Sequence, residues 1–157
     1  MNSAAIQKDK DLFEKINNIL SNDTINYLQT FSDKFLEKKK IDNVSVFYSK
    51  KDDPDFRFSN STLENKRLEL VDDIEEFLSR IATDTIASKT NAGFYEINSD
   101  AVFEIGGIEG QLEHTEVAVV EGSLHDGLFK PTLHSLAHKV CKTYDEFISI
   151  GEEILKI

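Results

Sequence analysis

FYEI at residues 94–97 and AVFEI at residues 101–105 are two short runs of β-branched and aromatic residues. Between them stand Asn, Ser and Asp at residues 98–100, the composition of a three-residue hairpin loop. Three glycines follow within residues 106–110, and a third apolar run occupies residues 112–120. Because glycines in such a run permit turns and bulges, this stretch predicts a three-stranded antiparallel meander around which the other elements are arranged.

Acidic side chains dominate the second part of the chain. Residues 61–157 contain 19 acidic and 8 basic residues, whereas residues 1–60 contain 10 of each, so the later part carries the whole net charge of −11. No lysine or arginine lies between Lys89 and Lys130, and eight acids fall in that interval. We expect a local acidic surface on the meander, which repels nucleic acid and anionic membranes and attracts basic partners.

The global composition is that of one globular domain spanning residues 1–157. A chain of this length buries about 70% of its unfolded surface, and a sequence with 39% hydrophobic residues and two prolines is not extensively disordered. Cys141 is the one cysteine, which excludes an internal disulfide and fits a reducing compartment. The first ten residues lack the apolar core of a signal peptide, and no window is apolar over the roughly 18 residues that a membrane span needs. We therefore expect a soluble, cytoplasmic protein.

The amino-terminal half is expected to contain helices and a hairpin. Apolar residues recur every three or four positions over residues 6–40, and the break at residues 21–24 predicts either one kinked helix or two short ones. The basic run at residues 37–40 is assigned to the carboxyl end of this helical segment. Residues 44–48 and 56–58 are predicted strands, joined by a polar loop. Ser61-Thr62-Leu63-Glu64 matches a capping box, which predicts a helix from residue 61 to about residue 87.

Two helices are expected at the carboxyl end. Pro131 suits a first helical turn, and an apolar stripe continues over residues 133–144. Thr143-Tyr144-Asp145-Glu146 matches a second capping box, which predicts a fresh helix to about Leu155. Together these elements predict a single α+β domain, in which an antiparallel sheet made of the hairpin and the three-stranded meander packs against N-terminal, central and C-terminal helices.

His134, His138 and Cys141 form the constellation that can carry metal chemistry. Their spacing of four and three residues puts them within about 60° of one another on a helix, and imidazole and thiolate are ligands that zinc prefers. A fourth ligand and an outer carboxylate are expected from one of two sequence pairs, His125-Asp126 or Glu113-His114. In the plainer interpretation the three residues border the core, and Cys141 is a small buried hydrophobe.

Familiar catalytic motifs are absent from the sequence. It contains no Gly-x-Ser-x-Gly, no phosphate-binding Gly-x-x-x-x-Gly-Lys and no dinucleotide-binding Gly-x-Gly-x-x-Gly. With three arginines, and with strand aromatics that stand among acids, nucleic-acid binding is also disfavoured. Binding of a basic protein through the acidic surface is therefore the leading interpretation, and it requires no enzymatic activity and no cofactor.

In its general character, small, acidic, cytosolic, α+β and free of catalytic motifs, the chain resembles bacterial toxin-immunity proteins and phage-encoded inhibitors. The resemblance implies inhibition of a basic partner, such as a nuclease toxin or a defence effector, by occlusion of its site. The residues expected to make this contact are Glu96, Asp100, Glu104, Glu109, Glu113, Glu116 and Asp126. Two alternatives stay open: a zinc-dependent hydrolase or metal sensor that uses the His-His-Cys face, and a secretion chaperone that binds through an apolar groove as a dimer.

Overall fold

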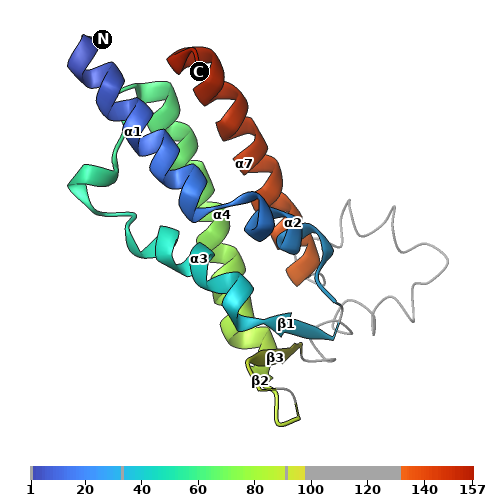
Figure 1. Cartoon of the computed structure of the whole chain (residues 1–157). Coiled ribbons are helices and arrows are strands. Elements are labelled where there is room, and N and C mark those ends of the chain that lie inside the picture. The colour runs from blue at the N-terminus through green and yellow to red at the C-terminus, as the bar shows by residue number, and fades with distance from the viewer. Residues whose placement is uncertain (1, 33, 91, 98–131) are drawn as a thin grey trace, which may run out of the picture.

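Helices predominate in the structure, and three short strands form one antiparallel sheet (Figure 1). The computed structural model describes residues 2–32, 34–90, 92–97 and 132–157. The elements are α1 (Ser3–Ile19), α2 (Asn22–Thr30), β1 (Phe35–Glu37), α3 (Lys38–Ser49), the 3-10 helix η1 (Pro54–Phe56), α4 (Ser61–Asp84), β2 (Thr85–Ala87), β3 (Phe94–Ile97) and α7 (Leu133–Leu155). The predicted α+β class is confirmed.

The break predicted at residues 21–24 separates two helices. Asn2 caps α1, because its side chain accepts a hydrogen bond from the backbone N–H of Ala5 at 2.8 Å. Ser21 caps α2 in the same way by accepting from the N–H of Thr24 at 3.4 Å. The capping residues therefore start a second helix rather than kink the first.

Residues 38–49 form helix α3, so the strand predicted at residues 44–48 is wrong. Ile41, Val44 and Phe47 recur every three residues and are all buried, which is the pattern of a helix rather than a strand. The strand predicted at residues 56–58 is also wrong, because Phe56 ends η1 and the two following residues belong to no strand. The predicted hairpin does not form.

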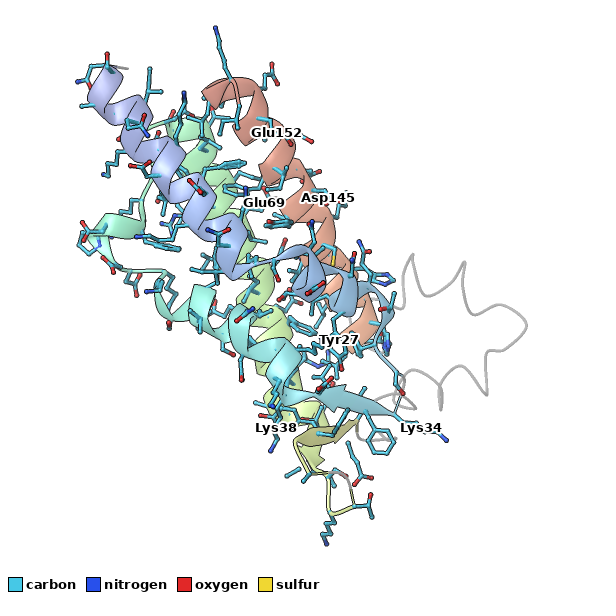
Figure 2. All side chains as sticks on the ribbon, viewed as in Figure 1. Tyr27, Lys34, Lys38, Glu69, Asp145 and Glu152 are labelled. Carbon is cyan, nitrogen blue, oxygen red and sulfur yellow. The ribbon has the colours of Figure 1, made fainter. Side chains whose placement is uncertain are left out.

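The basic run is not at the end of a helix, as predicted, but at the start of α3. Residues 38–40 occupy its first turn, where the helix macrodipole disfavours positive charge, and the N-cap Glu37 makes no side-chain capping bond. Local contacts hold this segment instead. The backbone N–H of Glu37 donates to the Tyr27 hydroxyl at 2.6 Å, and the Lys38 ammonium lies 4.8 Å from the centre of the Tyr95 ring, at the sheet end of the molecule (Figure 2).

Helix α4 begins at Ser61 as predicted, but its N-cap is Asn60 rather than Ser61. The Asn60 side chain accepts from the N–H of Leu63 at 3.0 Å. The fully buried carboxylate of Asp9 on α1 accepts from the N–H groups of Ser59 and Asn60, at 2.7 and 2.9 Å. Asp9 therefore joins α1 to the start of α4. The helix ends at residue 84, and residues 85–87, predicted as its last turn, are strand β2.

The strand predicted at residues 94–97 is confirmed as β3, and it lies at the centre of the sheet. The strand order is β1-β3-β2, and both pairings are antiparallel. Glu96 stands opposite Phe35 on one side and Ile86 on the other. The other two predicted meander strands, at residues 101–105 and 112–120, lie outside the described residues. Of the two observed partners of β3, β2 precedes it by six residues in a hairpin, whereas β1 comes from more than fifty residues earlier in the chain.

Helix α7 is continuous, so the fresh helix predicted at residue 143 is wrong. Thr132 is its N-cap, accepting from the N–H of Ser135 at 3.0 Å. Thr143 lies mid-helix, where its hydroxyl donates to the carboxylate of Asp73 on α4 at 2.5 Å. Thr143, the first residue of the second predicted capping box, therefore connects α7 to α4 and does not cap a helix.

One cluster of buried apolar side chains runs through the helices, and α4 and α7 form their most extensive contact. Around Phe147 of α7 stand the rings of Phe13, Phe58 and Tyr144, with centroids 5.1, 5.7 and 6.3 Å away. A Cβ on Gly151 would lie 2.5 Å from the Phe13 ring, so the glycine permits this close approach of α1 and α7. Among the helices described, none combines the length and the apolar character required to cross a membrane.

Candidate functional site

A groove follows α7 on the side where α1 and α2 lie. It consists of three adjoining hollows of about 610, 740 and 540 Å³. Asn17 and Ile148 line both the first and the second hollow, whereas Gln29 and Asp145 line both the second and the third. These shared residues make the hollows one surface, which we call the α7 groove.

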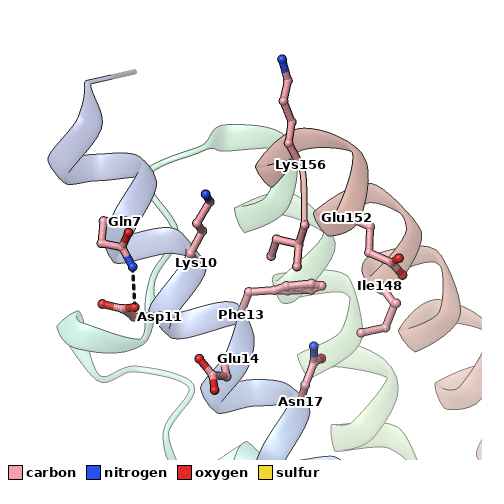
Figure 3. A pocket seen from close by; sticks show the side chains of 10 residues that line it. Gln7, Lys10, Asp11, Phe13, Glu14, Asn17, Ile148, Glu152 and Lys156 are labelled. Carbon is pink, nitrogen blue, oxygen red and sulfur yellow. Dashed lines mark hydrogen bonds between the residues drawn. The ribbon is translucent and has the colours of Figure 1, made fainter.

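The first hollow has an apolar floor and a charged rim (Figure 3). Phe13 reaches from α1 toward α7, where Ile148 lies, and together they form the floor. Lysines and carboxylates of both helices surround it, so the charges of the rim largely offset one another. Its residues from α1 are Gln7, Lys10, Asp11, Glu14 and Asn17, and those from the end of the chain include Glu152 and Lys156.

Uncharged amides dominate the second hollow. Asn18, Asn22, Asn26 and Gln29 expose their carboxamides along its α1 and α2 side. Of the described residues that line this hollow, Asp145 is the charged one (Figure 2). The hollow can therefore form many hydrogen bonds with an uncharged polar ligand, and one ion pair with a cation.

Tyr144 forms the base of the second hollow and joins α7 to the end of α1. Its hydroxyl lies 2.9 Å from the carbonyl oxygen of Leu20 and 3.1 Å from Oδ1 of Asn17. Burial, and next the negative charge of Asp145, raise the pKa of Tyr144 to about 12. The hydroxyl is therefore a permanent donor that closes the end of α1 rather than an acid or base.

The three predicted metal ligands each face a backbone carbonyl of the α2 segment. Nε2 of His134 lies 3.0 Å from the carbonyl oxygen of Phe31, whose ring it also stacks on at 4.0 Å between centroids. Nε2 of His138 lies 3.4 Å from the carbonyl oxygen of Gln29, and the Cys141 thiol lies 3.6 Å from that of Ile25. The last carbonyls of a helix have no partner within it, so the two histidines satisfy acceptors at the end of α2.

These contacts constrain what a metal ion could use. A carbonyl accepts only, so the ring nitrogen that faces it carries a proton and has no lone pair for a metal ion. Burial, and next the charge of Asp145, raise the pKa of Cys141 to about 11, which keeps the thiol protonated at neutral pH. The described residues contain no group of three His, Cys, Asp or Glu side chains placed to hold a metal. The remaining predicted ligands, His125-Asp126 and Glu113-His114, lie outside the described residues, so the metal site stays a prediction.

No family model, curated protein or solved structure matches this chain. Its function is therefore inferred from the geometry of its own side chains.

Of the seven acids predicted to contact a partner, the structure describes Glu96. It is half-buried on β3. The other six, from Asp100 to Asp126, lie outside the described residues. Four exposed acids lie along one side of α4, and we call them the α4 acidic face: Glu69, Asp72, Glu75 and Glu76.

The basic residues of α4 are engaged elsewhere or at the margin of this face. Lys66 contacts Glu69 at 2.8 Å and reaches across to Glu146 of α7 at 3.1 Å. Arg67 and Arg80 pair with Glu64 and Asp84 within their own helix, both at 2.6 Å. Lys139 of α7 lies 3.6 Å from Glu76, so among the described residues Asp72 and Glu75 are the two carboxylates of the face without a lysine or arginine partner.

Sequence reasoning missed the amides of the second hollow. Asn22, Asn26 and Gln29 are spaced by four and three residues, which places them on one face of a helix. That signal was present in the sequence. What they face could not be read from it, because the opposite wall belongs to α7, more than a hundred residues later.

Proposed function

We propose that this protein binds a basic partner protein and inhibits it by covering its functional surface. The observation that carries the proposal is the α4 acidic face. Its four carboxylates lie within an arc of about 120° on one helix. In the described part of the chain, neither Asp72 nor Glu75 has a lysine or arginine within ion-pair distance, and Glu75 accepts a hydrogen bond from the Tyr48 hydroxyl at 2.7 Å.

The charge of the whole chain supports the same proposal. Residues 98–131 add seven acids and one lysine in sequence, and the net charge is −11. A field of this sign accelerates encounter with a basic protein and disfavours contact with nucleic acid or an anionic membrane. The predicted contact residues Glu96, Asp100, Glu104, Glu109, Glu113, Glu116 and Asp126 remain part of the proposed surface.

The test begins with capture on the immobilised protein, followed by titration of each captured basic protein in purified form. We expect a partner whose activity is abolished at one equivalent. Reversing two acids, Asp72→Lys with Glu75→Lys, should weaken that complex about 100-fold or more, because each interfacial charge pair contributes roughly 1.5 kcal/mol or more and the reversal adds repulsion.

The matched control reverses two exposed acids of other helices, Asp42→Lys with Glu153→Lys, and changes the net charge by the same amount. It should retain the affinity within a few-fold. If both double variants weaken the complex equally, the effect comes from total charge and the α4 acidic face is not the contact. If no captured basic protein loses activity on titration, the inhibitory function itself is wrong.

A further inference from the structure

The amides of the second hollow have unused hydrogen-bonding capacity. Asn22, Asn26 and Gln29 are exposed, and their side-chain amides form no hydrogen bond within the described part of the chain. Each carboxamide offers two N–H donors and a carbonyl acceptor in one plane. Such a group can form two hydrogen bonds with the adjacent N–H and C=O of another peptide chain, which a lone carboxylate or ammonium cannot do.

Their spacing suits an extended peptide. The rise of a helix separates Asn22 from Asn26 by about 6 Å and Asn26 from Gln29 by about 4.5 Å along the axis of α2. Along one edge of an extended chain, equivalent backbone groups repeat about every 6.6 Å. The longer side chain of Gln29 can compensate for the shorter second interval, so the three amides can follow one edge of the peptide.

The opposite wall provides charge complementarity. Asp145 projects from α7 into both the second and the third hollow, and it is exposed. Facing the amides across the groove, its carboxylate is placed to pair with a lysine or arginine of a peptide held by them.

We propose that the α7 groove binds an extended segment of a basic protein, with Asn22, Asn26 and Gln29 bonded to its main chain and Asp145 to a lysine or arginine side chain. This inference rests on the proposed function and assigns it a second contact. Main-chain recognition of this kind gives affinity with little dependence on sequence, and the acid selects for basic segments.

The probe is a synthetic peptide of about ten residues with alternating lysine and threonine, which is basic and favours an extended chain. Its comparison peptide has every internal backbone nitrogen methylated, so charge and side chains are kept and main-chain donors are lost. NMR of the isotope-labelled full chain should show shifts of the side-chain amide signals of Asn22, Asn26 and Gln29 with the first peptide. The methylated peptide should bind about tenfold more weakly, or about 1.4 kcal/mol.

Two variants locate the contact. Asn22→Ala with Asn26→Ala should weaken peptide binding about tenfold, whereas the control Asn65→Ala, an exposed amide on α4, should leave it unchanged. Equal binding of both peptides, no shift of the amide signals at millimolar peptide, or equal binding by the double variant would overturn the proposal. The two proposals fail separately: if only the Asp72 and Glu75 reversals weaken the partner complex, inhibition stands and the groove does not take part.

Discussion

Replacing Gly151 with alanine adds one methyl group where α7 comes closest to α1. The new Cβ would lie 2.5 Å from Cε1 and Cζ of Phe13, and real Cβ contacts are essentially never below 3.0 Å. The Phe13 ring has little room to move, because it is 2% exposed and meets the Phe147 ring edge-on at 5.1 Å. The substitution should therefore force the two helices apart.

The size of the effect follows from two opposing contributions. Overfilling a well-packed core costs about 1 to 3 kcal/mol, and contact with three ring atoms at this distance places the cost near 3 kcal/mol. Alanine is favoured over glycine inside a helix by about 1 kcal/mol. The free energy of unfolding should thus fall by about 2 kcal/mol, which corresponds to a melting temperature lower by about 4 to 8 °C in a protein of this size.

Urea unfolding of Gly151→Ala, followed by circular dichroism, measures this loss. Ser149→Ala is the matched control, because it changes an exposed residue of the same helix and should be neutral or slightly stabilising. Adding Phe13→Leu removes the ring edge, so the double variant should be more stable than the sum of the single losses predicts, by about 1 kcal/mol or more. A Gly151→Ala protein as stable as the original, or strictly additive losses, would show that α1 and α7 are not in close contact there.

Three further predictions concern the Arg67–Glu64 ion pair, the two raised pKa values and the alternative zinc site. Arg67→Met should lower the free energy of unfolding by about 3 kcal/mol, since it leaves the partly buried carboxylate of Glu64 without its cation, and adding Glu64→Gln should recover part of the loss in urea unfolding. Folding raises the pKa of Cys141 to about 11 and that of Tyr144 to about 12, so the unfolded chain loses these protons at lower pH than the folded chain. The free energy of unfolding should therefore keep its full value below about pH 9 and fall as the pH rises to 12. In Cys141→Ala the fall over pH 9–11 should be smaller. Elemental analysis of the purified protein tests the alternative zinc site. Near-stoichiometric zinc that is lost in His138→Ala would establish the site, whereas we expect metal-free protein. We also expect the Cys141 thiol to be alkylated far more slowly in the folded than in the unfolded state.

Sequence periodicity located the long helices well, because each buries a stripe that repeats within its own length. The strand prediction at residues 44–48 was wrong for a related reason. Read as residues 44–48 alone, its β-branched and aromatic composition indicates a strand, but extending the window back to Ile41 reveals the three-residue repeat that α3 buries.

The sheet could be predicted only in its central strand. β3 carries the strongest strand composition, whereas β1 and β2 have three residues each and no local pattern to mark them. Both are strands because they pair with β3; the β1 pairing is non-local, and the β2 pairing closes a hairpin over residues 88–93 that has no strong turn signal. Thr85 and Ile86 are β-branched, and this was the available hint that α4 stops at residue 84.

In the candidate site, too, the local spacing could be predicted and the long-range contacts could not. The spacing of His134, His138 and Cys141 correctly predicted that they line one face of a helix. That this face meets carbonyl groups of α2 depends on contacts over 103 to 116 residues of sequence, which periodicity does not encode. A backbone carbonyl also has no sequence signature of its own, so the partners of these three residues could not be predicted.

The position of α7 after all the elements it covers has a consequence for the nascent chain. While residues 1–97 are already outside the ribosome, Phe13 and Phe58 have no Phe147 to contact, and the side of α4 that α7 covers stays open to water. Exposed apolar surface of this kind favours aggregation and attracts chaperones until it is buried. The apolar surface therefore stays exposed while residues 98–155 are translated, and cells with reduced chaperone capacity should accumulate this protein in inclusion bodies.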